Sequence, residues 1–131
     1  MLQQHETAAA IYCRLSRDDG GDAQSNSIVN QRDILRRFAA ENRMRLYDEY
    51  VDDGFSGTNF DRPDFKRMVA DIESKKINTV LCKDLSRLGR NNAIVAYYTE
   101  MFFPDRGIRL IALNDGIDTG RGENEIMALK A

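Results

Sequence analysis

The sequence predicts a three-layer α/β fold, in which a mostly parallel sheet is flanked by helices. Short runs rich in apolar or β-branched residues alternate with stretches whose apolar residues recur at helical spacing. Strands that alternate with helices in this way form parallel sheets covered on both faces. We expect strands at 8–16, 46–52, 78–83 and 108–113, and helices at 27–42, 61–76, 92–105 and from 123 onward.

Length and composition indicate one globular domain. The 131 residues are enough for a single core, and the hydrophobic fraction of 42% and charged fraction of 31% are ordinary. The leader, residues 1–7, lacks the profile of a signal peptide, and no apolar run approaches membrane-spanning length. We therefore expect a cytoplasmic protein.

The overall charge limits what the chain can bind by electrostatics alone. The net charge is −2 and the isoelectric point is about 5.4. Domains that bind nucleic acid through their overall charge are usually strongly basic. Any DNA chemistry must therefore come from a local arginine cluster or from another part of a longer protein.

The two cysteines are predicted to be buried and reduced. Cys13 and Cys82 lie inside predicted strands, neither has a CxxC partner, and the single histidine, His5, lies in the leader. This pattern argues against a structural zinc site. We expect the strands that carry the two thiols to be neighbours.

The first strand ends in Tyr12-Cys13-Arg14-Leu15-Ser16. Because side chains alternate along a strand, Tyr12, Arg14 and Ser16 point to one side. A hydroxyl at the carboxyl end of a strand lies where open α/β sheets bind their ligands. Taken alone, the pentapeptide favours ordinary roles, with Ser16 starting a turn and Arg14 solvated at an edge.

A polar loop at 17–26 separates this strand from the first helix, which Asn26 or Ser27 can cap. Gln31 falls on the apolar stripe of this helix, near its amino end. A buried amide needs hydrogen-bonding partners. Gln31 is therefore either an ordinary satisfied amide or a residue that faces the site near Ser16. The rest of the stripe is Ile28, Leu35, Phe38 and Ala39.

The second and third strands also end in polar residues. Asp52 ends the second strand, and Arg62 stands at the start of the helix that Pro63 opens. The third strand is followed by Asp84-Leu85-Ser86-Arg87-Leu88-Gly89-Arg90, in which Arg87 and Arg90 share one face of a helical turn. Gly89 adds no side chain that would crowd an approaching backbone.

The next helix, 92–105, is expected to place five apolar residues in contact with the core. These are Ile94, Tyr97, Tyr98, Met101 and Phe102. A turn at 114–116 follows the fourth strand. The last helix, 123–131, has no terminating glycine or proline, which predicts a chain that is cut inside an element.

One serine and several arginines without a core histidine indicate phosphate chemistry. The carboxyl edge of the sheet gathers Arg14, Ser16 and Asp52, together with the arginines of 84–90, and Arg62 lies just beyond it. Arginine keeps its charge, and its planar fork holds phosphate oxygens at two points. A serine nucleophile needs a base or a lowered pKa, so either the arginines stabilise its alkoxide or a carboxylate accepts the proton, and Asp52 and Asp84 are both candidates for that carboxylate. The competing interpretation is a set of surface ion pairs with some of the 21 acidic residues.

Six segments, taken together and in this order, resemble the catalytic domain of the serine recombinases, the resolvase and invertase group. The resemblance runs from residue 8 to the end and is greatest to the large serine recombinases of transposons and phages. The segments are Tyr12-Cys13-Arg14-Leu15-Ser16, Ser27-Ile28-Val29-Asn30-Gln31, Tyr50-Val51-Asp52-Asp53-Gly54-Phe55-Ser56-Gly57, Asp61-Arg62-Pro63, Lys83-Asp84-Leu85-Ser86-Arg87-Leu88-Gly89-Arg90 and Asn114-Asp115-Gly116-Ile117.

The resemblance implies that Ser16 attacks a DNA phosphodiester, forming a 5′-phosphoserine link and releasing a 3′-hydroxyl. It implies dimers and a tetramer of the full-length protein that cut two double-stranded recombination sites and rejoin them, with no metal and no ATP. Arg14, Arg87 and Arg90 would bind the scissile phosphate. The supporting or phosphate-binding residues would be Tyr12, Gln31, Asp52, Arg62 and Asp84.

Two features depart from the small resolvases. Ser86 stands where they usually carry an acid, which removes one candidate proton carrier, and the loop after Ser16 is longer. The resemblance also implies a long helix and DNA-binding domains beyond residue 131. All 131 residues are therefore expected to form one catalytic domain.

Two other functions remain open on the sequence. A phospho-accepting receiver domain could use Asp18, Asp19 and Asp84 as a Mg²⁺ pocket, but Ser16 and the arginines would then have no role. Mg²⁺-dependent labelling by a small phosphodonor would support it. A non-catalytic interaction module of the same fold would tolerate the loss of Ser16.

Overall fold

The computed structural model describes residues 7–16 and 27–120 of the chain. Their strands form one five-stranded sheet with the order β2-β1-β3-β4-β5. The first four strands are parallel, and β5 runs antiparallel to β4. The strands are β1 (Ala8–Leu15), β2 (Arg45–Asp53), β3 (Thr79–Cys82), β4 (Arg109–Ala112) and β5 (Ile117–Asp118). The predicted mostly parallel sheet is confirmed, whereas β5 lies beyond the strands that the sequence predicted.

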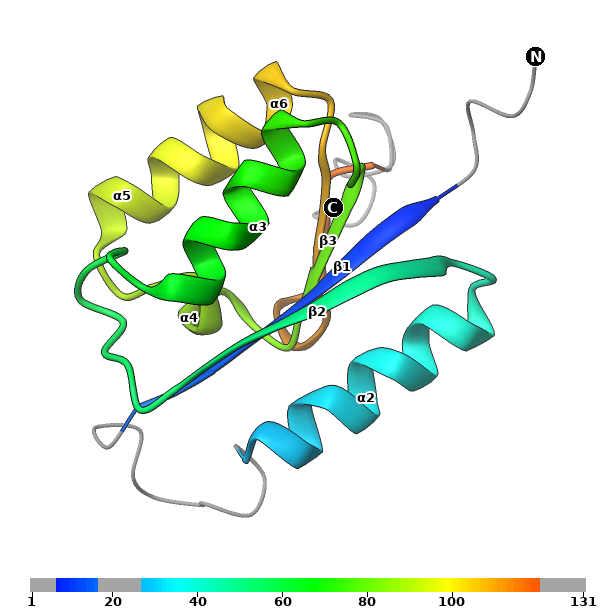
Figure 1. Cartoon of the computed structure of the whole chain (residues 1–131), viewed down its shortest axis with the longest axis horizontal. Helices are drawn as coiled ribbons and strands as arrows, with labels where there is room; N and C mark the ends of the chain where they lie inside the picture. Colours follow the sequence, from blue (N-terminus) through cyan, green and yellow to red (C-terminus); the bar gives the residue numbers. More distant parts are fainter. Residues whose placement is uncertain (1–6, 17–26, 121–131) are drawn as a thin grey trace.

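Helices cover both faces of the sheet, which confirms the three-layer prediction (Figure 1). The α2 helix (Ile28–Glu41) covers one face, and α3 (Pro63–Glu73), α5 (Asn92–Tyr97) and α6 (Phe103–Asp105) cover the other. A short helix, α4 (Leu85–Leu88), follows β3. The predicted loop 17–26, the predicted helix start at 123–131 and residues 1–6 of the leader lie outside the described residues.

The strand β1 separates two halves of the core, as its period of two predicts. Ile11 and Cys13 pack toward α2 with Leu35, while Tyr12 packs on the other face with Phe65 of α3. Both cysteines are buried and free, and β1 pairs with β3, so the prediction of buried thiols on neighbouring strands is confirmed. Burial raises the pKa of the Cys13 thiol to about 12, and it also raises the pKa of Cys82.

The helix predicted at 92–105 is interrupted by a π-helical turn, η3 (Tyr98–Phe102), between α5 and α6. A π turn places one extra residue in a helical turn, so the residues beyond it face a different direction than a regular helix predicts. Phe102 is buried as predicted, but Tyr97 and Met101 are 44% and 55% exposed. The prediction of a core contact is therefore wrong for Met101, whereas the ring of Tyr97, which precedes the π turn, still lies 6.2 Å from the ring of buried Phe102, measured between ring centres.

No helix within 7–16 and 27–120 combines the length and the apolar character needed to cross a membrane. The cytoplasmic location stays a prediction.

Candidate active site

The carboxyl end of β1 extends past its neighbour β3. Pairing with β3 covers Ala9–Ile11, whereas pairing with β2 continues to Leu15. At Arg14 the main chain is bonded by side chains instead. Gln31 Oε1 accepts from Arg14 N at 3.2 Å, and Gln31 Nε2 and Arg87 Nη1 donate to Arg14 O at 3.0 and 2.7 Å. The end of β1 is thus held by α2 and by the segment that follows β3.

Ser16 comes directly after β1 and is 7% exposed. The amide of Gly54, just after β2, donates to Leu15 O at 2.6 Å and fixes the chain next to the serine. Gln31 is buried, and its amide is satisfied by the main chain of Arg14, two residues before Ser16. Gln31 is therefore a satisfied amide, and its two hydrogen bonds also position the strand end that carries Ser16.

Arg14 and Arg87 are joined by reciprocal hydrogen bonds. Arg14 Nε donates to Arg87 O at 3.1 Å, and Arg87 Nη1 donates to Arg14 O at 2.7 Å. Arg14 also donates to Ser86 O at 2.6 Å and to Phe55 O at 3.0 Å. Both arginines are buried. Each guanidinium therefore fixes the main chain of the segment that carries the other.

Asp84 and Ser86 orient the Arg87 side chain. Arg87 Nε lies 3.3 Å from Asp84 Oδ1, and Arg87 Nη2 donates to Ser86 Oγ at 3.0 Å. The Ser86 hydroxyl in turn donates to Asp84 Oδ1. Ser86 is thus a bridge between Asp84 and Arg87.

Tyr12, Asp52 and Arg62 form a second buried network beside the first. Tyr12 Oη donates to Asp52 Oδ2 at 2.7 Å and accepts from Arg62 Nη1 at 2.6 Å. Burial is the main cause that raises the pKa of the Tyr12 phenol, while Arg62 opposes it. Tyr12 therefore stays protonated and remains a donor to Asp52.

Asp52 also begins α3. Its two carboxylate oxygens accept from the amides of Asp64 and Phe65 at 3.0 and 2.9 Å. The residue at the N-cap position, Arg62, makes no side-chain cap. Asp52 therefore supplies the negative charge that the positive end of the helix favours. With the Tyr12 hydroxyl added, the carboxylate accepts three hydrogen bonds.

The Arg62 side chain is fully buried among aromatic rings and carbonyl groups. Its guanidinium lies 4.4 Å from the ring centre of Phe60 and 5.1 Å from that of Phe65. Arg62 Nη2 donates to Leu88 O, and Arg62 Nε donates to Asn59 O at 3.0 Å. Arg62 thus ties the start of α3 to the end of α4.

Two glycines allow the loop before α3 to pack closely against the arginine segment. A Cβ at Gly57 would lie 2.7 Å from Arg14 Nη2, and a Cβ at Gly89 would overlap the Phe60 ring. The predicted close approach at Gly89 is therefore made by this loop. Arg90 N donates to Gly57 O at 2.7 Å, while the Arg90 side chain is exposed.

The structure thus brings most predicted site residues to one edge. Arg14, Gln31, Asp84 and Arg87 are linked by hydrogen bonds, with Arg90 exposed at the rim. The second network joins the first because Arg62 Nη1 also lies 3.5 Å from Arg87 O. The interpretation of the arginines as surface ion pairs does not fit Arg14, Arg62 and Arg87, which are buried.

Sequence reasoning missed Lys83 as a residue of this edge. Lys83 is only 7% exposed, and its Nζ lies 3.3 Å from Asn30 Oδ1 in the first turn of α2. The signal was a lysine at the end of an apolar strand, next to Asp84. The Asp18 and Asp19 of the receiver hypothesis lie outside the described residues. Within the described ranges, no group of three or more His, Cys, Asp or Glu side chains could hold a metal ion.

Comparisons with known proteins agree with this fold. The family model described as the resolvase N-terminal domain matches residues 9–129. The N-terminal catalytic domain of TP901-1 integrase is similar in structure, with a TM-score of 0.81 and 33% identity over 95% of this chain and 90% of that chain. A resolvase family site-specific recombinase from Streptococcus pneumoniae has a TM-score of 0.72 and 32% identity over 95% of this chain and 84% of that chain.

A more distant neighbour is the C-terminal catalytic domain of ISC1926 TnpA, an IS607-like serine recombinase. Its TM-score is 0.68 at 20% identity, over 94% of this chain and 76% of that chain. At this identity the similarity shows the fold alone.

Proposed function

This chain belongs to the resolvase family of serine recombinases, and from that premise we propose that it is the catalytic domain of a site-specific DNA recombinase with Ser16 as its nucleophile. The family match spans residues 9–129, which confirms the resemblance identified from the sequence motifs. It also favours a recombinase over a receiver domain.

One observation carries the proposal: Ser16 follows a strand whose end is held by two buried arginines. Burying a guanidinium costs free energy unless its hydrogen bonds and charge are used. Arg14 and Arg87 direct several donors to main-chain carbonyls, and Arg87 also contacts the Asp84 carboxylate. Two buried guanidinium groups concentrate positive charge at the strand end that carries Ser16, which favours binding of a phosphodiester, an anion that a serine can attack.

In the proposed step, Ser16 Oγ forms a bond to phosphorus while the bond from phosphorus to the 3′-oxygen breaks. The serine gives up its proton, and the leaving oxygen takes up a proton to become a 3′-hydroxyl. Arg14, Arg87 and Arg90 hold the phosphate and stabilise the charge of the transition state. The link to Ser16 is itself a phosphodiester, similar in free energy to the DNA bond that was cut. Attack on it by a 3′-hydroxyl therefore rejoins the DNA without ATP.

Asp84 is better supported than Asp52 as the proton acceptor for Ser16. Both oxygens of Asp52 already accept hydrogen bonds, and its role in starting α3 depends on a charged carboxylate. Asp84 is less buried and contacts Arg87 through one oxygen, Oδ1, in the structure. We assign the remaining members of the predicted set, Tyr12, Gln31, Asp52 and Arg62, to positioning the arginines and the strand end.

The assembly is proposed from the family. A dimer would bind each double-stranded recombination site, two dimers would form a tetramer, and one pair of subunits would rotate between cleavage and rejoining. The net charge of −2 supports a division of labour in which most DNA affinity comes from other domains of a longer protein.

The decisive experiment tests whether a covalent protein–DNA adduct forms through Ser16. The complete recombinase is incubated with duplex DNA carrying its recombination site, and protein–DNA adducts are separated under denaturing conditions. The wild type should retain the 5′ end of the cut strand and leave a 3′-hydroxyl, whereas Ser16→Ala should bind DNA and form no adduct. Ser74→Ala, an exposed serine at the end of α3, is the matched control. An adduct formed by Ser16→Ala would exclude Ser16 as the nucleophile.

A further inference from the structure

The helix that carries Arg87 is too short to be stable by itself. α4 contains only Leu85–Leu88, and a single helical turn pays the full nucleation cost for few hydrogen bonds. Its geometry therefore depends on groups from elsewhere in the chain. Both ends of α4 are held in this way, by different parts of the molecule.

Buried arginines hold the carboxyl end of α4. Arg14 donates to the carbonyls of Ser86 and Arg87, and Arg62 donates to the carbonyl of Leu88. Cations are favourable at the carboxyl end of a helix, where the unpaired carbonyls gather. This end of α4 is fixed by residues already placed in the site.

The amino end of α4 is held by Asp115, which is not among the site residues described above. Asp84 occupies the N-cap position, but it makes no side-chain cap because its carboxylate contacts Arg87 and Ser86. The amide of Leu85 donates instead to Asp115 Oδ2 at 2.7 Å, across 30 residues of sequence. Asp115 therefore takes the capping role that Asp84 gives up.

The turn that carries Asp115 is firmly placed. It forms the 3-10 turn η4 (Leu113–Asp115), which Gly116 ends with a φ of +66°, a conformation that favours glycine. The Asn114 amide donates to Lys83 O at 2.7 Å, directly before Asp84. The turn thus bonds the main chain on both sides of Asp84. Because Asp115 is exposed, core packing does not explain its position.

We propose that Asp115 is a positioning residue for recombination, which fixes the start of α4 so that Asp84 remains available to orient Arg87. This role rests on the proposed function of the site. Asp115 acts through the Leu85 amide and does not touch the reacting atoms. The acceptor oxygen, rather than the negative charge, is what the role requires.

Two variants separate the acceptor from the charge. Asp115→Ala removes both, whereas Asp115→Asn keeps an oxygen that can accept from the Leu85 amide. The control is Asp105→Ala, which changes another exposed aspartate, in α6. Melting temperatures of all three variants would be measured alongside, so that a slower reaction is not confused with unfolding.

The first readout is solvent exchange of the Leu85 amide in the 131-residue chain, followed by nuclear magnetic resonance. Loss of a cap should speed this exchange about fivefold in Asp115→Ala, while Asp115→Asn and Asp105→Ala should match the wild type. The second readout is the rate of adduct formation by the complete recombinase on its site. Small displacements of positioning groups slow catalysis strongly, so we expect a loss of about tenfold in Asp115→Ala, rescue in Asp115→Asn and unchanged DNA affinity.

The possible outcomes separate a failure of the role proposed for Asp115 from a failure of the proposed function. Normal exchange and normal cleavage in Asp115→Ala would overturn the proposal, as would an Asp115→Asn variant as slow as Asp115→Ala. A change in exchange without a change in cleavage would reduce Asp115 to a structural cap and also overturn it. A wild type that forms no adduct would overturn the proposed function itself, and this failure is distinct because the exchange experiment needs no DNA.

Discussion

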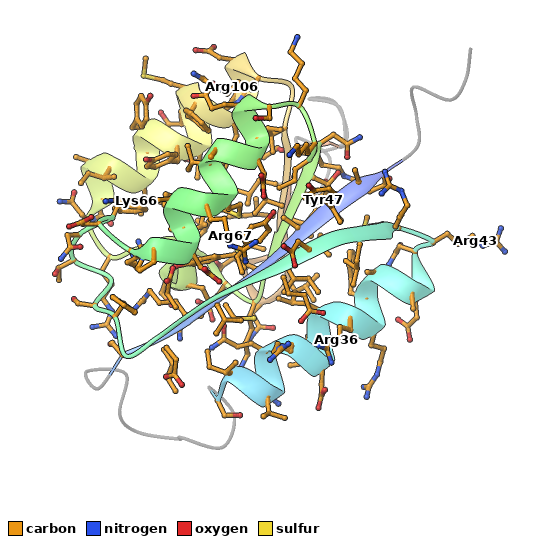
Figure 2. All side chains as sticks on the ribbon, viewed as in Figure 1. Arg36, Arg43, Tyr47, Lys66, Arg67 and Arg106 are labelled. Atoms are coloured by element: carbon orange, nitrogen blue, oxygen red, sulfur yellow. The ribbon has the colours of Figure 1, made fainter. Side chains whose placement is uncertain are left out.

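Arginines on the outer faces of α2 and α3 are held by carboxylates. Arg36 Nε lies 2.6 Å from Glu49 Oε2, and Arg67 Nη1 lies 2.6 Å from Asp48 Oδ2. Figure 2 labels both arginines, one on α2 and the other beside α3. Both side chains are partly exposed, and their charges are matched by neighbouring acids. The Arg67 pair lowers the pKa of the Asp48 carboxyl through a hydrogen bond.

Arginines at the carboxyl edge of the sheet carry the same charge in a different setting. Arg14 and Arg62 are fully buried and donate to main-chain carbonyls of residues 86–88. Within the described part of the chain, the partners of Arg62 are all neutral groups. The comparison teaches that exposure and partner type, rather than residue identity, separate arginines in surface ion pairs from arginines that brace the main chain at the carboxyl edge of the sheet.

The largest contrast should appear in stability. Arg62→Ala removes a buried side chain and leaves the carbonyls of Asn59 and Leu88 with fewer donors, so it should lower the free energy of unfolding by about 3 kcal/mol or more. Arg67→Ala removes a partly exposed ion pair and should lower it by less than about 1 kcal/mol. Urea denaturation of the 131-residue chain measures both. Equal losses would contradict the distinction between the two sets of arginines.

The second contrast concerns catalysis. Arg87→Lys and Arg90→Lys keep the charge but lose the planar fork that holds a phosphate at two points. Cleavage by the complete recombinase should fall at least about tenfold in each variant, which corresponds to about 1.4 kcal/mol of barrier. Arg36→Lys, on the outer face, should cleave at the rate of the wild type. Near-normal cleavage by both edge variants would place the phosphate elsewhere.

The smallest expected effect is on the pH dependence of stability, through the buried thiols of Cys13 on β1 and Cys82 on β3. The pKa of Cys13 rises from its ordinary value to about 12 in the folded chain because of burial. An unfolded thiol ionises near pH 8.5. Above that pH only the unfolded state loses the proton, so the thiol contribution to stability should decrease as pH rises toward 12. Native-state labelling with a thiol reagent should be slow at pH 8 and fast in urea, and rapid labelling of the native chain would contradict burial.

The fold was predictable because its signals are local. The alternation of β1 places Ile11 and Cys13 toward α2 and Tyr12 toward α3, as the pattern indicated. The stripe of α2 likewise located Gln31 among buried residues. In each case the apolar residues recur with a period of 2 or 3.6 residues, which can be seen in the sequence itself. The parallel sheet follows from the order of those elements.

The details of the site were not predictable, since they depend on contacts between distant segments. The carbonyls that Arg14 bonds belong to Phe55, Ser86 and Arg87, and any residue type can supply a main-chain carbonyl. The cap from Asp115 to Leu85 spans 30 residues. The π turn at Tyr98–Phe102 depends on one extra residue in a helix whose composition looks regular. None of these features leaves a periodic signal.

The reciprocal hydrogen bonds between Arg14 and Arg87 also limit how the sequence can change over generations. Each side chain donates to the main chain of the other residue. A substitution at either position therefore removes a cation and, at the same time, a donor that holds the opposite segment. A later change at the second position restores neither, since the lost bond went to a backbone atom. A substitution at either position therefore has two costs, and no side-chain change at the other position compensates for them.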